Sequence, residues 1–295
     1  MSPAEGAPAA GAPTVDAGTR GIDPPAADLY LDLVKRSLAG LVSGEEYQAV
    51  NPAGGWRRRV VQLASVVLAR RGIELLRNVP VDLEKREVGL DWPAHAVSMI
   101  GTRRLDNLDH CVRDVIRRGV PGDLIETGVW RGGATILMRA VLRAYGDTER
   151  SVWVADSFEG LPPPDPEGYP ADRGDRHWTF DALAVSMDEV RRNFERYGLL
   201  DDRVRFLKGW FRDTLPAAPI SRLAVLRLDG DMYESTMVAL RALYPKLSRG
   251  GYVIVDDYGA VPSCKAAVHD FIAEQGVRAE LRPIDWTGVY WERAD

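Results

Sequence analysis

The chain has 295 residues, a formal net charge of −5 at pH 7, 45% hydrophobic residues and 27% charged residues. This composition is ordinary for a folded globular protein and excludes a collagen-like, disulfide-dense or wholly disordered chain. The negative charge gives no reason to expect binding to nucleic acid or to an anionic membrane, and no apolar run is long enough for a transmembrane helix. We therefore expect a cytoplasmic protein whose partner is a small molecule.

Residues 1–26 are dominated by Ala, Pro and Gly. A segment of this composition cannot bury enough apolar surface to offset the entropy of ordering the chain. It also lacks the basic start and the apolar stretch of a signal peptide. We expect these residues to form a disordered tail outside the folded part of the protein.

The next part of the chain, residues 27–122, is predicted to be a helical N-terminal segment. Apolar residues recur at helical spacing over 29–41 and 56–76, and a third helix is expected over 106–118. Residues 88–108 are mixed and aromatic, and their pattern favours no single structure. The segment therefore predicts extra helices in front of a separate core.

From residue 123 the pattern changes to short apolar runs that alternate with helices of ordinary length. Strands are predicted at 123–127, 151–155, 203–209, 223–228 and 251–255, and helices at 132–145, 181–197, 233–247 and 262–275. Such alternation is typical of βαβ units and a mostly parallel sheet. The last two strands, 279–284 and 287–293, are joined by a short turn and must pair antiparallel. The prediction for 123–295 is an α/β core with a seven-stranded sheet ending in an antiparallel hairpin, which resembles the class I S-adenosylmethionine (SAM)-dependent methyltransferases.

A glycine-rich loop follows the first core strand. It begins at Glu126 and Thr127 and contains Gly128, Gly132 and Gly133, which let the backbone turn tightly and approach a ligand. The spacing matches neither GxGxxG nor GxxxxGK[ST], which argues against a nicotinamide dinucleotide and against a P-loop. An acid followed by Gly-x-x-x-Gly suits the methionine end of SAM, although the loop could also be a structural turn.

The next two strands end in residues that would complete a SAM site. Asp156 and Ser157 end the second strand, where an acid can accept hydrogen bonds from both ribose hydroxyls. Gly209, Trp210 and Phe211 follow the third strand, where an adenine ring would stack. Ligands bind at the carboxyl ends of parallel strands, so these ends together predict one cofactor site. Trp210 could instead be a core aromatic residue.

Acidic residues end the fourth and fifth strands. Asp229 and Asp231 follow the fourth strand, and Asp256 and Asp257 follow the fifth. Carboxylates gathered at one edge of a sheet raise each other's pKa unless a cation neutralises them, and oxygen ligands favour Mg²⁺. We therefore predict a metal site made of Asp229, Asp256 and Asp257. Asp231 lies just before a helix and is interpreted as its cap.

These residues predict metal-assisted O-methylation. A cation beside the SAM methyl group would bind an acceptor hydroxyl and lower its pKa, Asp229 would accept the proton, and the alkoxide would attack the methyl group in line. A phenol or an amine is the alternative acceptor, but an amine needs less activation, so the acidic set favours oxygen. A non-catalytic SAM-binding protein would be expected to lack at least one of the three acids.

Five long blocks of the sequence closely resemble the macrocin O-methyltransferase family, over about residues 27–293. The blocks are 91–108, 122–139, 154–164, 226–236 and 250–258. Members methylate sugar hydroxyls of antibiotics, for example in the tylosin, mycinamicin and novobiocin pathways. The resemblance implies a class I SAM-dependent fold, Mg²⁺ dependence, a glycosylated small-molecule acceptor that carries a deoxysugar, and a homodimer or larger homo-oligomer. A free nucleotide sugar is an alternative acceptor.

The resemblance also implies a role for individual residues. Asp229 would be both a metal ligand and the catalytic base, with Asp256 and Asp257 as the other two ligands. The implied cofactor site consists of Met99, Glu126, Thr127, Gly128, Arg131, Asp156, Ser157, Gly209, Trp210 and Phe211. Met99 and the adjoining Ile100 resemble the part of the family that folds over cofactor and acceptor. On this basis residues 27–122 are expected to form a lid as well as a helical segment.

The loop after the second strand, residues 157–180, is too long for a plain connection and is predicted to recognise the acceptor. It carries Glu159, His177 and Trp178, which provide the hydrogen-bonding and aromatic groups that a sugar site requires. Tyr258, after the fifth strand, is assigned to the same site. His177 could be a second general base, or it could be an exposed loop histidine without a catalytic role.

Overall fold

The structure is a computed structural model that describes residues 24–42, 46–50 and 55–294. Most of the predicted tail, 1–23, lies outside the described residues. Helix α1 (Pro24–Leu38) begins with a proline, which is favoured in the first turn of a helix, so the folded part starts before the predicted boundary at residue 27. Within the described part of the chain, no helix is both long and apolar enough to cross a membrane.

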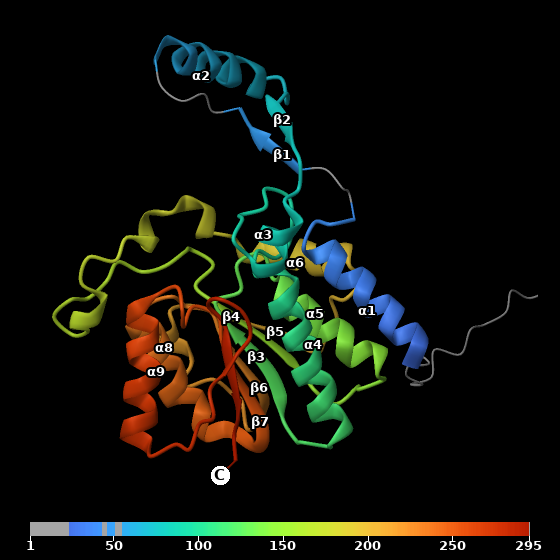
Figure 1. Cartoon of the computed structure of the whole chain (residues 1–295), viewed down its shortest axis with the longest axis vertical. Helices are drawn as coiled ribbons and strands as arrows, with labels where there is room; N and C mark the ends of the chain where they lie inside the picture. The colour runs from blue at the N-terminus through green and yellow to red at the C-terminus, as the bar shows by residue number, and fades with distance from the viewer. Residues whose placement is uncertain (1–23, 43–45, 51–54, 295) are drawn as a thin grey trace, which may run out of the picture.

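A seven-stranded sheet forms the centre of the molecule, with the strand order β5-β4-β3-β6-β7-β9-β8 (Figure 1). The strands are β3 (Asp123–Thr127), β4 (Val152–Asp156), β5 (Val204–Lys208), β6 (Leu223–Leu228), β7 (Leu247–Val255), β8 (Arg282–Pro283) and β9 (Val289–Glu292). The first five pair in parallel, while β9 pairs antiparallel with both β7 and β8. The predicted α/β class and the antiparallel end of the sheet are thereby confirmed.

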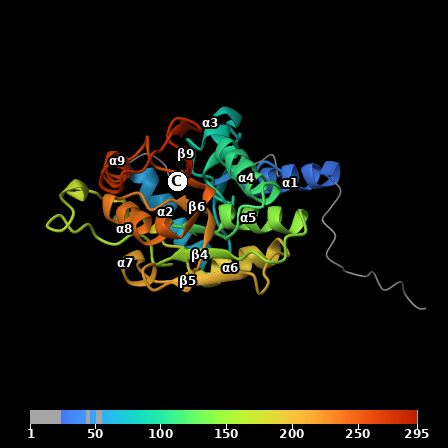
Figure 2. The same ribbon diagram turned by 90° about the horizontal axis from the view of Figure 1, so that it is seen from below.

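Helices cover both faces of the sheet, which is why its central strands are continuous apolar runs (Figure 2). One face packs against helices α4 (Gly101–Arg117), α5 (Gly133–Ala144) and α6 (Met187–Arg196), and the other against α7 (Phe211–Thr214), α8 (Tyr233–Leu243) and α9 (Pro262–Gln275). Helix α1 packs on α4 and α5. Each face has its own apolar cluster, represented by Leu137 on the first and Phe271 on the second. The two layers hold the strand ends in fixed relative positions.

The N-terminal segment differs most from its prediction. The helix expected over 56–76 is α2 (Gly55–Ala69), and it lies between β1 (Glu46–Ala49) and β2 (Leu76–Val79), which pair antiparallel. We call the described residues of 46–79 the N-terminal arm, and Figure 1 shows β1, α2 and β2 standing away from the sheet. Its strands have only four residues each, and β2 is largely exposed, so no alternating apolar pattern marked them.

Other element boundaries moved for local reasons. The unassigned stretch 88–108 contains the end of α3 (Leu83–Val88) and the start of α4, which begins at Gly101 instead of 106. Helix α6 begins at Met187 because Ser186 caps it, and Pro245 follows closely after the end of α8. The long loop continues to residue 186, beyond its predicted end at 180, because α6 begins only at Met187. It contains three single turns of 3-10 helix: η1 (Pro170–Asp172), η2 (His177–Thr179) and η3 (Asp181–Leu183). A fourth, η4 (Tyr244–Lys246), follows α8.

Candidate active site

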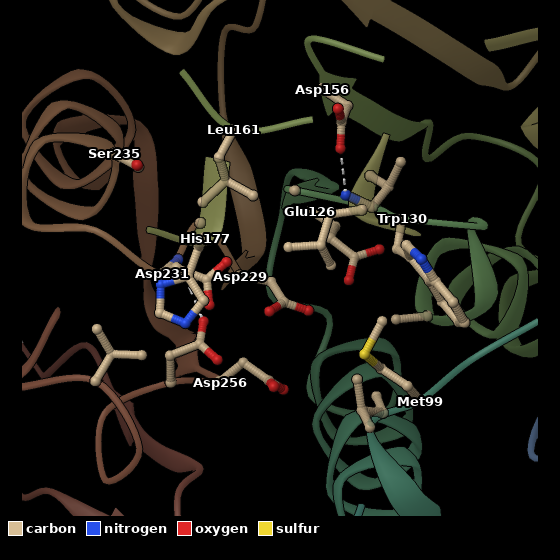
Figure 3. A pocket seen from close by; sticks show the side chains of 18 of the residues that line it. Met99, Glu126, Trp130, Asp156, Leu161, His177, Asp229, Asp231, Ser235 and Asp256 are labelled. Carbon is tan, nitrogen blue, oxygen red and sulfur yellow. Dashed lines mark hydrogen bonds between the residues drawn. The ribbon is translucent and has the colours of Figure 1, made fainter. Parts of the chain in front are cut away.

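A cavity of about 310 Å³ lies at the carboxyl ends of the parallel strands (Figure 3). Residues after β3, β4, β5, β6 and β7 line it, together with parts of 89–104 and of the long loop. This is where ligands bind in parallel α/β sheets. The structure therefore brings most of the predicted strand-end residues around one cavity.

The loop after β3 approaches the neighbouring strand end closely. Gly128 has a left-handed backbone with φ of 86°, and a Cβ at this position would collide with the carbonyl of Asp229. Glycine is thus required here for both conformation and space. Trp130 also has a positive φ, 46°, which is rare for a large residue. Its ring lines the cavity, and its Nε1 donates a hydrogen bond to the carbonyl of Ala182.

Glu126 is a buried acid at the cavity wall. Its Oε1 accepts a hydrogen bond from Arg227, while its Oε2 is buried with no partner among the described residues. Burial outweighs the attraction of Arg227 and raises the pKa of Glu126 to about 8. The unpaired oxygen is available to a hydrogen-bond donor on a ligand.

The ends of β4 and β5 supply the residues predicted for the ribose and adenine. Asp156 accepts hydrogen bonds from the backbone N–H groups of Val129 (2.8 Å) and Phe158 (2.7 Å), and it lines the cavity (Figure 3). Burial raises the pKa of Asp156, opposed by these hydrogen bonds. Ser157, Trp210 and Phe211 line the same cavity, as does Met99 from the N-terminal segment.

Three residues predicted to bind the cofactor do not line the cavity: Thr127, Arg131 and Gly209. Arg131 extends instead to the N-terminal segment, where its Nη1 donates to the carbonyls of Ala94 (2.9 Å) and Ala96 (2.8 Å). Its guanidinium also lies 4.2 Å from the centre of the Trp130 ring. Arg131 therefore holds 93–96 next to the glycine-rich loop.

The three predicted metal ligands meet at one side of the cavity. Asp229, Asp256 and Asp257 each offer a carboxylate oxygen within 4.8 Å of the other two. Arg227, which is fully buried, donates to Asp229 Oδ2 at 2.6 Å and also to Asp256. Arg104 donates to the other oxygen of Asp256 from helix α4. Two buried arginines thus fix Asp256, whereas no described cationic side chain forms an ion pair with Asp257.

The electrostatics of this group favour a cation. Burial raises the pKa of Asp229, and the charge of Asp256 raises it further. Burial likewise raises the pKa of Asp257 well above its usual value, with Asp231 adding to the effect. The attraction of Arg227 and Arg104 does not offset these effects. The described residues therefore leave an excess of negative charge that a divalent ion would relieve.

Asp231 does not cap helix α8, so that interpretation of the sequence is wrong. The first two N–H groups of α8, at Tyr233 and Glu234, donate instead to Asp172 of the long loop. Asp231 has a left-handed backbone with φ of 58° and lines the cavity beside His177 (Figure 3). Burial and the neighbouring Asp229 raise its pKa to about 7.

The predicted acceptor residues are only partly brought together. His177 lines the cavity, and its Nδ1 lies 2.7 Å from Asp175 Oδ2. Glu159, Trp178 and Tyr258 lie outside the lining. The Glu159 carboxylate is 3.6 Å from the exposed Lys208 ammonium, Trp178 is 47% exposed, and the Tyr258 hydroxyl bonds the ring of His269.

Sequence reasoning missed several residues of the site. Arg227 is the clearest case, because an arginine inside the otherwise apolar run 223–228 is a signal of a buried ion pair. Arg104 gave no such signal, since α4 has many charged residues. The other missed lining residues include Trp92, Trp130, Leu161, Leu183, Ser235 and Trp286.

Comparisons with known proteins agree with this geometry. Residues 27–293 match the macrocin O-methyltransferase (TylF) family. The chain is 51% identical over 267 residues to the 8-demethyl-8-(2,3-dimethoxy-alpha-L-rhamnosyl)-tetracenomycin-C 4′-O-methyltransferase of Streptomyces olivaceus, covering 90% of this chain and 93% of that protein. It is 46% identical over 270 residues to the mycinamicin III 3″-O-methyltransferase of Micromonospora griseorubida, covering 90% and 97%.

A solved structure gives the same result for the fold. The O-methyltransferase NovP superposes on this chain with a TM-score of 0.78 at 50% identity, covering 91% of this chain and all of that one. The sheet order and the antiparallel end are those of class I SAM-dependent methyltransferases. Taken with the matched residues and the identities above, this agreement shows that the chain belongs to the macrocin O-methyltransferase family.

Proposed function

We propose that this protein is an Mg²⁺- and SAM-dependent O-methyltransferase that methylates a sugar hydroxyl of a glycosylated natural product in antibiotic biosynthesis. The observation that carries the proposal is the meeting of Asp229, Asp256 and Asp257 in the cavity that Glu126 and Asp156 also line. This arrangement would hold an activated hydroxyl and a methyl donor next to each other. A cytoplasmic location and a homo-oligomeric state stay predictions.

On the cofactor side of the cavity, described residues could contact three parts of SAM: the ammonium group, the ribose and the adenine. Bound SAM supplies a methyl group on a positively charged sulfur. Glu126 Oε2, which has no described partner, would accept a hydrogen bond from the ammonium group. Asp156 keeps lone pairs for the ribose hydroxyls besides those used by Val129 and Phe158. Trp210 offers an aromatic face beside the adenine position.

Asp229, Asp256 and Asp257 would hold the metal ion, because hard divalent cations prefer carboxylate oxygens. Bound Mg²⁺ supplies positive charge that favours the ionised form of a nearby hydroxyl. The raised pKa values of Asp229 and Asp257 fit this assignment, since they reflect acids buried together without a sufficient counter-charge. Arg227 and Arg104 would keep Asp256 in position.

Two carboxylates are placed to accept the proton of the acceptor hydroxyl. Asp229 is the predicted base, but it already accepts a hydrogen bond from Arg227 at 2.6 Å, which stabilises its ionised form. Asp231 lines the same cavity, and no ion pair with a described cationic side chain engages its carboxylate. We keep Asp229 as the proposed base and Asp231 as the second candidate.

The acceptor class is supported by the loop side of the cavity. The long loop contributes the apolar Leu161, Pro162 and Leu183 together with the polar His177. Apolar surface with a few hydrogen-bonding groups suits a sugar ring. The name of the S. olivaceus relative describes a rhamnosyl-tetracenomycin acceptor and that of the M. griseorubida relative describes mycinamicin III, each for that protein only. We extend a glycosylated acceptor to this chain as a proposal.

The test is a methyl-transfer assay with SAM on glycosylated antibiotics, their aglycones, simple phenols, amines and nucleotide sugars. Each acceptor is assayed with and without EDTA, and again after Mg²⁺ is restored. We expect transfer to a sugar hydroxyl that EDTA abolishes and Mg²⁺ restores. Asp229→Asn should lower kcat by about 10²–10⁴-fold. Asp213→Asn, at an exposed aspartate of α7 outside the cavity, is the matched control and should leave kcat unchanged.

Asp231→Asn separates the two candidate bases. Binding of Mn²⁺, followed by its electron paramagnetic resonance, should be lost in Asp229→Asn and retained in Asp231→Asn if Asp229 is a metal ligand. If one of the two variants still binds Mn²⁺ but no longer transfers the methyl group, the residue replaced in that variant is the base. Methyl transfer that ignores EDTA and survives Asp229→Asn would overturn both roles and favour an amine acceptor.

A further inference from the structure

Between residues 159 and 184 the long loop has a single buried residue, and that residue is an acid. This residue is Asp172, with 1% of its surface exposed. Burying a carboxylate is costly unless hydrogen bonds or charges compensate it. The contacts of Asp172 therefore identify a place where this part of the loop is attached to the body of the protein, in addition to the hydrogen bond from Trp130 to the carbonyl of Ala182.

Asp172 is attached to the start of helix α8. Its Oδ1 accepts a hydrogen bond from the backbone N–H of Tyr233 at 2.7 Å, and its Oδ2 accepts one from Glu234 at 2.9 Å. The residue at the cap position of α8 itself, Met232, provides no side-chain hydrogen bond. The first N–H groups of a helix lack internal partners and favour a negative charge. Asp172 supplies both from a distant part of the chain, and we call this contact the loop latch.

A short series of hydrogen bonds leads from the latch to His177. The carbonyl of Asp172 accepts from the N–H of Asp175 at 3.0 Å. The Asp175 carboxylate accepts from the N–H of His177 at 2.8 Å and lies 2.7 Å from its Nδ1. The rings of Tyr169 and Tyr233 also pack beside the latch, with centres 6.1 Å apart. The position of the His177 ring is therefore tied to the start of α8.

The start of α8 lies next to the cavity residues Asp229 and Asp231. Tyr233 comes two residues after Asp231, which lines the cavity beside His177 (Figure 3). The loop latch thus joins the loop to the turn that carries Asp229 and Asp231. Because Nδ1 of His177 is bonded to Asp175, Nε2 of the neutral ring is left as a hydrogen-bond acceptor for a ligand hydroxyl.

We propose that Asp172 is a positioning residue that, through the loop latch, holds the Asp175–His177 pair at the cavity, where His177 contacts a hydroxyl of the acceptor. Asp172 itself touches no ligand and acts through His177. The identity of the acceptor rests on the proposed function, but the attachment of the loop does not. The two can therefore be tested separately.

The first test needs no acceptor. Amide hydrogen exchange of the full chain is compared for the wild type, Asp172→Ala and Asp172→Asn, in peptides from the loop and from the first turn of α8. Asp172→Ala should exchange about tenfold faster in both places. Asp172→Asn should fall between Asp172→Ala and the wild type, because its single amide oxygen can accept only one of the two hydrogen bonds from Tyr233 and Glu234. Asp165→Ala is the matched control, since Asp165 is exposed and caps only a local turn at Glu167 and Gly168.

The second test uses methyl transfer to whichever acceptor the assay above identifies. Asp172→Ala should raise the acceptor KM about tenfold with a smaller change in kcat, and it should leave the Kd of SAM within about twofold. If the latch acts through His177, the effects are not additive. Asp172→Ala should then change KM by less than about twofold in a His177→Ala background.

Unchanged exchange in Asp172→Ala would overturn the latch. Additive effects of Asp172→Ala and His177→Ala, or an equal loss of SAM affinity, would overturn the role through His177 and indicate general destabilisation. If the wild type methylates no sugar, the proposed function fails while the exchange experiment still decides the latch. If it methylates a sugar and Asp172→Ala leaves both exchange and KM unchanged, only this inference fails.

Discussion

The two sides of the cavity are built in different ways. On the cofactor and metal side, the functional side chains follow buried strands, and backbone N–H groups or the buried Arg227 hold Glu126, Asp156 and Asp256. On the acceptor side, residues 159–184 of the loop are exposed or partly buried, and Asp172 is the one buried residue among them. The first side is fixed by the core of the fold, and the second by a few local hydrogen bonds.

This difference indicates that the strand side positions the methyl donor and the metal, while the loop side selects the acceptor. Groups that must meet the same donor in a fixed geometry lie on elements whose burial leaves them no freedom. Groups that choose an acceptor lie on a loop, where residues can change without unfolding the sheet. Changes on the strand side should therefore cost folding stability as well as activity, while changes on the loop side should affect mainly the acceptor.

The largest effect should come from a metal ligand that is also structural. Asp256→Asn removes the carboxylate that the buried Arg227 and Arg104 share. Arg227 keeps its ion pairs with Glu126 and Asp229, and Arg104 keeps its ion pair with Asp285. The free energy of unfolding should therefore fall by about 3 kcal/mol, the lower end of the range for a broken buried ion pair. Asp257→Asn is the matched control, because the one hydrogen bond described for its carboxylate is a long one, 3.4 Å, from the backbone of Asp231. Urea unfolding without metal measures both.

Asp257→Asn should change the free energy of unfolding by less than about 1 kcal/mol, although both variants should lose Mn²⁺ binding. Equal destabilisation by the two substitutions would contradict the structural role of the arginines. Retained Mn²⁺ binding in both variants would contradict the metal site but leave the stability comparison intact.

An intermediate effect is expected from Glu126, whose burial raises its pKa to about 8. Between the unfolded value near 4.5 and 8, the folded protein holds a proton that the unfolded chain has released. This contribution to stability is present at low pH and is lost as the pH rises, with a slope of at most about 1.4 kcal/mol per pH unit. Urea unfolding of the wild type and of Glu126→Gln at pH 5.5, 7 and 8 measures it.

Because Gln cannot ionise, the variant should lack this part of the pH dependence. Parallel curves for the two proteins would mean that Glu126 does not retain its proton in the folded state. Added SAM should reduce the loss of stability at higher pH, since the proposed ammonium contact stabilises the ionised carboxylate.

The same contrast explains what could be predicted from the sequence. Strands β3 and β6 were placed at their observed bounds because strands buried on both faces are continuous apolar runs. The acids at their ends followed from the rule that ligands bind at carboxyl ends. The two strands of the arm were not predicted because each has only four residues and β2 is largely exposed. Helix α6 was extended too far because η3 continues the helical spacing.

Contacts between distant parts of the chain could not be predicted from the sequence. Arg104 and Asp256 are 152 positions apart, and Asp172 and Glu234 are 62 apart. Neither pair has a local pattern, because each is created by the packing of separate elements. For the same reason Asp231 was interpreted as the cap of α8, when the true cap comes from another loop.

The smallest effect is expected at Trp178, which was predicted to bind the acceptor but is 47% exposed and lies outside the cavity lining. Trp178→Ala should change the acceptor KM and kcat by less than about twofold, because removing the Trp178 ring takes no side chain away from the cavity wall. The preceding residue, His177, does line the cavity. His177→Ala is therefore the matched comparison, and it should raise the acceptor KM more than Trp178→Ala does. A KM increase of about tenfold in Trp178→Ala, seen with large glycosylated acceptors and absent with small sugars, would contradict this prediction. It would mean that the aglycone packs against the outer face of the loop, and that the acceptor site extends beyond the cavity onto exposed residues.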